Sequence, residues 1–274
     1  MFDILKKALP IVALGGLLSI PFNVQAGDIN DLWQGGINEM QDSDAERVLD
    51  ANGNVKTSGD LVVGDVIQTV LRWTDVNGGV IGDQNPPDFV FPYQFTAYSE
   101  IEVASITGTG VMIPDGSGGM TEIVNLTFVA TGNLRDADSL IDLYQTNNAA
   151  NRMELDNQTA DEAVAAVQSQ QYLLSMGFKE ADDYWNSTAP LAIDVLANLG
   201  PESPQAGAAT LGLSMLNNPG QIPVFRNGIM GINGDYHDFV GSTSVYERGN
   251  VNETWTFSSN TIISFRVPAP ASLA

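Results

Sequence analysis

The fold class of this chain is decided by the stretch EIVNLTFVAT, residues 122–131. Apolar and polar residues alternate along it. Val124, Leu126 and Phe128 fall on one face of an extended chain, and Asn125 and Thr127 fall on the other. This period of two is typical of a β-strand with one buried face. The stretch therefore predicts a half-buried strand.

Other segments rich in β-branched and aromatic residues are separated by frequent turn signals. The Asn-Gly pairs at Asn52-Gly53 and Asn77-Gly78 favour the positive φ angles of tight hairpin loops. We therefore expect a mainly β fold, an antiparallel β-sandwich formed by a single domain over residues 27–267. The other expected strands are Leu61–Trp73, Phe89–Thr107, Leu140–Tyr144, Leu211–Leu216, Ser242–Glu247 and Thr254–Val267.

A short helical segment at about residues 160–200 interrupts the strands. Thr159-Ala160-Asp161-Glu162 is a capping-box sequence, which predicts a helix that runs to about Gln170. Leu191–Leu199 precedes a Gly-Pro pair and predicts a second short helix. Tyr172–Phe178 either continues the first helix or begins a strand. Near the N-terminus, we expect a short helix around Glu39–Arg47.

The first 26 residues have the three parts of a secretory signal peptide. Lys6 and Lys7 precede the apolar run Ala8–Phe22, and Ala26 lies at the position that signal peptidase reads. We expect cleavage between Ala26 and Gly27, and hence a bacterial protein exported from the cytoplasm. The alternative is an uncleaved membrane anchor. Prolines, glycines and amides dilute the apolar run, however, and a spanning helix needs about 20 predominantly apolar residues.

Composition excludes several classes of function. The chain has 33 acidic residues against 11 Lys and Arg, a net charge of −22. Such a surface repels phosphate backbones, so we expect no nucleic-acid binding. With no cysteine and one histidine, the chain has no disulfide, no thiol nucleophile and no zinc site of the Cys/His kind. That histidine, His237, lies in a polar context, and we expect it on a surface loop without a catalytic role.

Alternating carboxylates indicate calcium, because this hard cation prefers several oxygen ligands from a compact segment. None of the segments matches the EF-hand loop. The alternative is that the acidic residues are solvated and only keep an exported protein soluble. The candidate calcium ligands are Asp42, Asp44, Glu46, Asp136, Asp138 and Asp142.

Paired carboxylates are a second possible basis for chemistry, since two of them suffice for glycoside hydrolysis. Glu100 and Glu102 share one face of an expected strand, and Asp182-Asp183 precede Tyr184-Trp185. The alternative is that these acids are solvated charges and that Trp185 belongs to the core. A cleft lined by Trp or Tyr, with two carboxylates about 5–10 Å apart, would favour an enzyme.

The last eight residues are VPAPASLA, residues 267–274. Pro268 and Pro270 end the preceding strand because proline cannot donate to a β-ladder. We expect residues 268–274 to form an exposed tail. The tail resembles the start of the sorting signal of PEP-CTERM proteins, the substrates of bacterial exosortases, in which Glu is usual where this chain has Ala269. The apolar helix and basic tail that continue the signal in that family are absent from this sequence.

The resemblance covers eight of 274 residues. It implies a Gram-negative cell envelope, an exosortase as processing partner after signal peptidase, and association with extracellular polysaccharide. We therefore expect an exported, non-enzymatic cell-surface or extracellular-matrix protein of the biofilm type. Calcium is its one candidate cofactor. The alternative is a secreted carbohydrate-active hydrolase that uses paired carboxylates.

Overall fold

The computed structural model describes residues 33, 35–76, 79–80, 93–115, 117–155, 157–197, 207–246 and 255–269. The predicted signal peptide, the cleavage site at Ala26 and Gly27, and Pro270 lie outside these residues. Antiparallel strands dominate the described part, which confirms the predicted mainly β, sandwich-like class.

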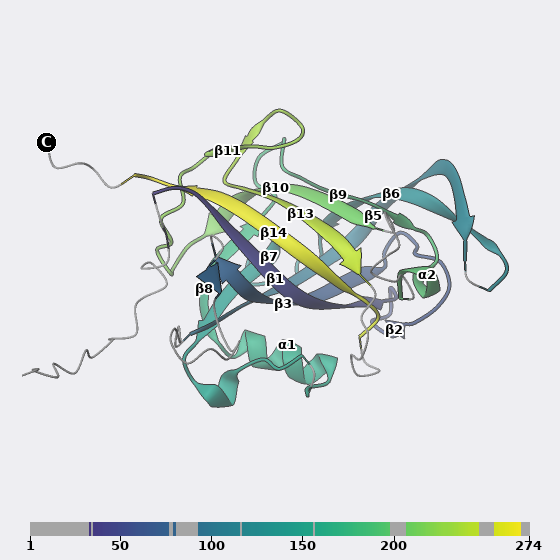
Figure 1. Cartoon of the computed structure of the whole chain (residues 1–274), viewed down its shortest axis with the longest axis horizontal. Coiled ribbons are helices and arrows are strands. Elements are labelled where there is room, and N and C mark those ends of the chain that lie inside the picture. Colours follow the sequence, from purple (N-terminus) through teal and green to yellow (C-terminus); the bar gives the residue numbers. More distant parts are fainter. Residues whose placement is uncertain are drawn as a thin grey trace, which may run out of the picture.

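The described elements are strands, two α-helices and one 3₁₀ turn (Figure 1). The strands are β1 (Gly36–Leu49), β2 (Val55–Lys56), β3 (Val66–Val76), β4 (Gly79–Val80), β5 (Gln94–Pro114), β6 (Met120–Ala130), β7 (Ser139–Thr146), β8 (Gln171–Gly177), β9 (Tyr184–Pro190), β10 (Ala208–Asn217), β11 (Ile229–Met230), β12 (Tyr236–His237), β13 (Phe239–Tyr246) and β14 (Ser258–Val267). The helical elements are η2 (Ala149–Asn151), α1 (Ala160–Gln168) and α2 (Ile193–Ala197).

One twelve-stranded sheet carries the fold, in the order β4-β3-β1-β14-β13-β10-β8-β7-β5-β6-β9, with β2 paired to β1. Two further pairings, β3 with β5 and β10 with β9, join parts of the sheet that are distant in this order. The path of hydrogen-bonded strands therefore closes on itself. Opposite walls of the closed sheet face each other across one core. The two layers expected of a sandwich are therefore parts of the same sheet.

The core lies between these walls and follows the alternation of the sequence. On β6, Val124, Leu126 and Phe128 are buried, whereas Asn125 and Thr127 are exposed. This confirms the prediction for residues 122–131. Each large apolar side chain that is buried in this way stabilises the fold by about 1.5–3 kcal/mol.

Helix α1 covers part of the outer face, below the ring in Figure 1. The predicted capping box is present: the Thr159 hydroxyl accepts from the Glu162 amide, and the Glu162 carboxylate accepts from the Thr159 amide at 2.9 Å. Ala163 and Val167 are fully buried and belong to a second apolar cluster with Tyr98 of β5. Neither this helix nor any other in the described ranges has the length and apolar character of a membrane-spanning segment.

Some local predictions were wrong or left open. The helix expected around Glu39–Arg47 was wrong, because these residues form the middle of β1. Pairing with β3 on one side and β14 on the other outweighs the helix propensity of its Glu, Met, Ala and Arg residues. The sequence allowed either a helix or a strand at Tyr172–Phe178, and most of this segment forms β8. The final strand was expected from Thr254 but begins at Ser258.

Candidate functional site

Polar side chains gather at several places in the described part of the chain, and three of these places bear on function. The first is the joint between β1 and β14, called the seam here and defined by Asp42, Asp44, Glu46, Ser259 and Thr261. The second is a hollow on the outer face over Glu100, and the third is a loop network around His237. All three contain residues that the sequence singled out, and the third also contains His237, which the sequence placed wrongly.

The seam carboxylates point into the core. Asp42, Asp44 and Glu46 occupy alternate positions of β1, in phase with Met40 and Val48, which belong to the central apolar cluster. Their exposed fractions are 3%, 1% and 9%. Residues two apart on a strand share a face, so the alternation that suggested calcium ligands on the surface instead places three carboxyl groups on the inner wall.

These carboxyl groups replace part of the main-chain ladder. The backbone pairing of β1 with β14 runs from Gly36↔Val267 to Gln41↔Ile262 and then stops. The Asp42 carboxylate accepts from the Thr261 amide at 2.6 Å, and the Asp44 carboxylate accepts from the Ser259 amide. Backbone bonding resumes at Glu46, whose amide donates to the Phe257 carbonyl at 2.9 Å. The seam is therefore a short gap bridged by side chains.

Burial in this position changes the acidity of the seam. Desolvation raises the pKa of Asp42 well above its usual value, and the neighbouring charge of Asp44 raises it further. Desolvation likewise raises the pKa of Glu46, again with Asp44 as the next cause. Both effects have the same origin, because an ionised carboxylate away from water loses its solvation and repels a second one nearby.

The structure does not bring the six candidate calcium ligands together. Asp136 and Asp138 lie at the turn before β7, where Asp138 is exposed, and Asp142 is fully buried on β7. There Asp142 accepts from the hydroxyls of Ser139 and Ser175 at 2.8 and 2.6 Å. Across the described ranges, no group of three or more His, Asp and Glu side chains is arranged to hold a metal ion. Asp42, Asp44 and Glu46 face the core and are not arranged around a cation. Calcium binding stays a prediction for the acids at the turn before β7, and thermal melts in calcium and in magnesium at equal ionic strength would test it.

The outer hollow contains the carboxylate pair that the sequence suggested. Its volume is about 450 Å³, and Glu100 and Glu102 of β5 line it together. The other lining residues are a third acid, Asp50, and side chains that are small, aliphatic or amide-bearing, and none of those described is Trp or Tyr. The full lining is Leu49, Asp50, Ala51, Gly53, Gly64, Val66, Gln68, Glu100, Glu102 and Asn133.

Glu100 is held as an anion at the floor of this hollow. Its carboxylate accepts from the Tyr98 hydroxyl at 2.5 Å, from the Asn133 amide at 2.5 Å and from the Gln68 amide at 3.0 Å. Burial alone would raise the pKa of Glu100, but these hydrogen bonds outweigh burial and lower it below its usual value. A carboxyl group with a lowered pKa is a poor general acid at neutral pH. The glycosidase role suggested for this pair therefore lacks its proton donor at Glu100.

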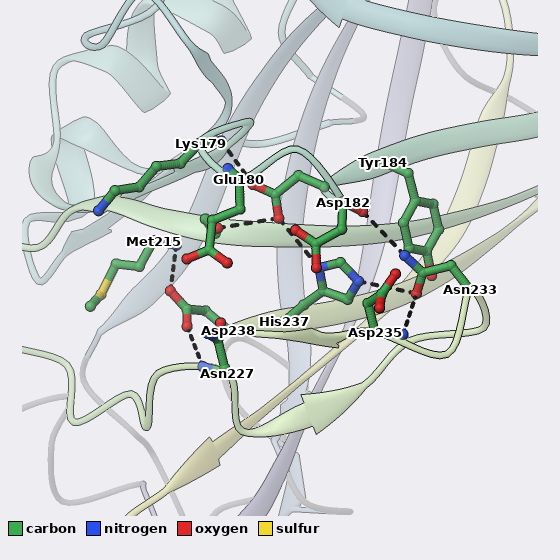
Figure 2. A network of polar contacts seen from close by, with 12 residues as sticks. Lys179, Glu180, Asp182, Tyr184, Met215, Asn227, Asn233, Asp235, His237 and Asp238 are labelled. Carbon is green, nitrogen blue, oxygen red and sulfur yellow. Dashed lines mark hydrogen bonds and ion pairs between the residues drawn. The ribbon is translucent and has the colours of Figure 1, made fainter.

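The prediction that His237 lies on a surface loop was wrong, because its exposed fraction is 1%. Its Nδ1 lies 3.3 Å from the carboxylate of Asp183, and its Nε2 lies 3.2 Å from the side-chain oxygen of Asn233 (Figure 2). The ring also contacts that of Tyr184 edge to face, with centroids 5.4 Å apart. The sequence GDYHD around His237 is locally polar, and nothing in it reveals partners on distant segments.

Both ring nitrogens of His237 face acceptors. Asn233 is oriented by two other bonds, because its side-chain oxygen accepts from the Asp235 amide and its NH₂ group donates to the Asp182 carbonyl, both at 3.1 Å. Its oxygen therefore faces His237, so Nε2 must donate. Nδ1 faces the Asp183 carboxylate on the other side of the ring. Both nitrogens of the buried His237 ring are thus engaged, one with Asn233 and one with Asp183.

Asp183 ties this pair to the rest of the fold. Its carboxylate also accepts from the amides of Lys179 and Glu180, both at 2.8 Å, and from the Ser214 hydroxyl at 3.2 Å. Ser214 therefore bonds to the acid and not to the histidine, so the three residues do not form a nucleophile-base-acid relay. The network fixes the β11–β12 hairpin against β9 and β10.

The alternative that Trp185 belongs to the core is confirmed, whereas Asp183, a solvated charge in that alternative, has a buried side chain. The Trp185 indole packs against the central cluster and meets Phe128 edge to face, with ring centroids 6.2 Å apart. Beside it lies a cavity of about 50 Å³, which is mostly apolar and has Glu46, Thr69 and Thr243 among its lining residues. A cavity of this size has room for ordered water but not for a sugar ring.

Neither a family model, nor a curated protein, nor a solved structure matches this chain. Its chemistry is therefore argued from its own geometry. Within the described residues, the conspicuous polar groups are engaged in holding strands and loops together: the seam carboxyls join β1 to β14, Glu100 is clamped on β5, and His237 anchors a hairpin.

Proposed function

We propose that this is an exported, non-enzymatic protein of the cell surface or extracellular matrix that is processed through its C-terminus. The observation that carries the proposal is the position at which the fold ends. Strand β14 pairs with β1 as far as Val267, whose side chain is buried, whereas Pro268 and Ala269 are exposed. The segment that resembles a sorting signal thus begins directly where the sheet stops.

This position suits a recognition sequence. A membrane protease needs an extended, accessible peptide, and Pro268 prevents the chain from continuing the β14 ladder. β14 itself lies between β1 and β13 in the sheet. Processing after Val267 would therefore leave every strand of the fold intact.

The non-enzymatic part of the proposal has separate support. The Glu100–Glu102 hollow has no aromatic side chain among its described lining residues. Glu100 is fixed as an anion, and both nitrogens of His237 are occupied. In these two sites Glu100 and His237 thus take part in structural hydrogen bonds.

The expected partners are signal peptidase, an exosortase and an extracellular polysaccharide. To test the sorting step, the chain would be produced in a Gram-negative host with and without an exosortase, extended after Ala274 by an apolar helix and a basic tail. We expect surface-exposed, tail-processed protein only with the exosortase. The double variant Pro268→Ala, Pro270→Ala should be exported with unchanged thermal stability but should remain unprocessed. Equal processing of the double variant, or processing without the enzyme, would refute the proposal.

The hydrolase alternative is separated by a second measurement. The exported chain would be incubated with extracellular polysaccharides while binding and the release of reducing ends are both followed. We expect binding without release. Release that disappears in the double variant Glu100→Gln, Glu102→Gln would instead establish an enzyme that uses this carboxylate pair.

A further inference from the structure

The Ser259 hydroxyl of the seam lies between two carboxyl groups. The hydroxyl of Ser259 lies 2.5 Å from Oδ2 of Asp44 and 2.9 Å from Oε1 of Glu46. A serine hydroxyl has one hydrogen to donate and can also accept. If both carboxyl groups were ionised, one of these short contacts would join two acceptors. One of the two carboxyl groups must therefore carry a proton.

The donors around Asp44 identify it as the ionised member. Asp44 accepts from the amide and the hydroxyl of Ser259 and, at 3.4 Å, from the hydroxyl of Thr261. A carboxylate that accepts several hydrogen bonds is favoured in its charged form. Protonated Glu46 then donates a hydrogen bond to the Ser259 oxygen, and the Ser259 hydroxyl donates to the Asp44 carboxylate.

Asp42 provides an independent observation at the other end of the seam. Its Oδ2 is buried and has no partner among the described residues, while its Oδ1 accepts the Thr261 amide. Trp73 lies directly cross-strand from Asp42, and its buried indole N–H also has no partner in the described part of the chain. A buried ionised oxygen without a donor is costly, whereas a protonated one is much less so.

We infer that Asp42 and Glu46 are protonated at neutral pH while Asp44 is ionised, and that the seam is a pH-sensitive closure between β1 and β14. The facing groups on neighbouring elements are the hydroxyls of Thr69 on β3 and Thr243 on β13. The arginines of β1 and β3, Arg47 and Arg72, occupy the alternate positions of their strands, which face outward.

Ionisation of either acid would place a second negative charge on the inner wall, two residues from Asp44. Because no backbone ladder joins β1 to β14 between Gln41 and Glu46, side-chain bonds are the ties that remain there. Repulsion between carboxylates would therefore weaken the side-chain hydrogen bonds that join β1 to β14 in the seam. The raised pKa values of Asp42 and Glu46 agree with this order of protonation.

The sign of the pH effect follows from linkage. A carboxyl group whose pKa is raised in the folded state contributes its full stability below the ordinary carboxyl pKa, and that contribution is lost as the pH rises through the raised value. Within that window, each such group lowers the folding equilibrium constant by about tenfold per pH unit. The chain should therefore be most stable in mild acid and should lose stability on going to neutral and alkaline pH.

The test is equilibrium unfolding of the full-length chain between pH 4.5 and about 8.5, at high salt to screen surface repulsion. Glu46→Gln and Asp42→Asn keep the side-chain size but cannot ionise. Each should therefore abolish one group's contribution to the pH dependence, which is a fall of the folding equilibrium constant by about tenfold per pH unit. Glu102→Gln is the matched control on the outer face and should keep the full dependence. The inference is overturned if the wild-type chain shows no such decline or if Glu46→Gln keeps the same slope.

A second readout needs only the wild-type chain and so covers the case in which a variant fails to fold. Protonated carboxyl groups have a carbonyl stretching band that carboxylates lack. We expect this band in the infrared spectrum at neutral pH, and we expect its loss at alkaline pH to coincide with faster exchange of the Ser259 and Thr261 amides. Absence of the band at neutral pH would overturn the inference.

Discussion

Replacing Asp183 by Asn should be among the most destabilising single changes in this protein. The Asp183 side chain is 1% exposed, and its carboxylate accepts four hydrogen bonds, one of them from His237. An Asn amide has one acceptor oxygen, so its NH₂ group would face either the amides of Lys179 and Glu180 or the Ser214 and His237 side. In both orientations two of the four donors lose their acceptor.

The magnitude follows from the burial of the Asp183 carboxylate. Losing a hydrogen bond to a charged group costs about 1.5–3 kcal/mol, and Asp183→Asn loses two of the four. The free energy of unfolding of domains of this kind is about 5–15 kcal/mol. We therefore expect Asp183→Asn to fold, but with a much lower midpoint of urea unfolding. The four tryptophans provide the fluorescence signal.

Asp182→Asn is the matched control. Asp182 contributes its main-chain carbonyl to the network, through the bond from Asn233, and this carbonyl survives the substitution. Its unfolding free energy should change by no more than about 0.5 kcal/mol. A loss below about 1 kcal/mol in Asp183→Asn would refute the argument that the Asp183 carboxylate anchors this network.

Three further changes probe other parts of the fold. Thr159→Ala removes the N-cap of α1 and should cost about 1 kcal/mol in chemical unfolding, with an unchanged stability arguing against the capping box. Tyr98→Phe removes a donor to the Glu100 carboxylate and should cost about 1.5–3 kcal/mol at neutral pH. Because the pKa of Glu100 is lowered, this stabilisation is present above the ordinary carboxyl pKa and is lost as the pH falls through the lowered one, so the difference from wild type should shrink in acid. Deleting residues 268–274 should leave the melting temperature unchanged, whereas deletion from Ser258 onward removes β14 and should prevent folding; a destabilisation above about 1 kcal/mol by the shorter deletion would make the tail part of the fold.

Several features of this protein were determined by the sequence alone, because their causes are local. The alternation at residues 122–131 identifies the buried face of β6, since successive side chains of any strand point to opposite sides. The capping box at Thr159 and Glu162 fixes the start of α1 through bonds within one turn. Pro268 marks the end of β14 because its ring removes a backbone donor.

Other features were decided by tertiary structure, because their causes lie far apart in the chain. The segment Glu39–Arg47 has helix-forming residues, but it becomes a strand through pairing with β3 and β14. The alternating acids on it could equally have faced solvent. They face the core because Met40 and Val48 share their face and because Thr261, 219 residues away, supplies the amide that Asp42 accepts.

The same reason explains why His237 was misplaced. Its local sequence is polar and typical of a loop, and its burial depends on Asp183, 54 residues away on the segment before β9. A charged side chain is buried only when a partner compensates the loss of hydration. Whether such a partner is within reach is set by the closure of the sheet, which pairs β10 with both β8 and β9, and no local pattern in the sequence encodes that closure.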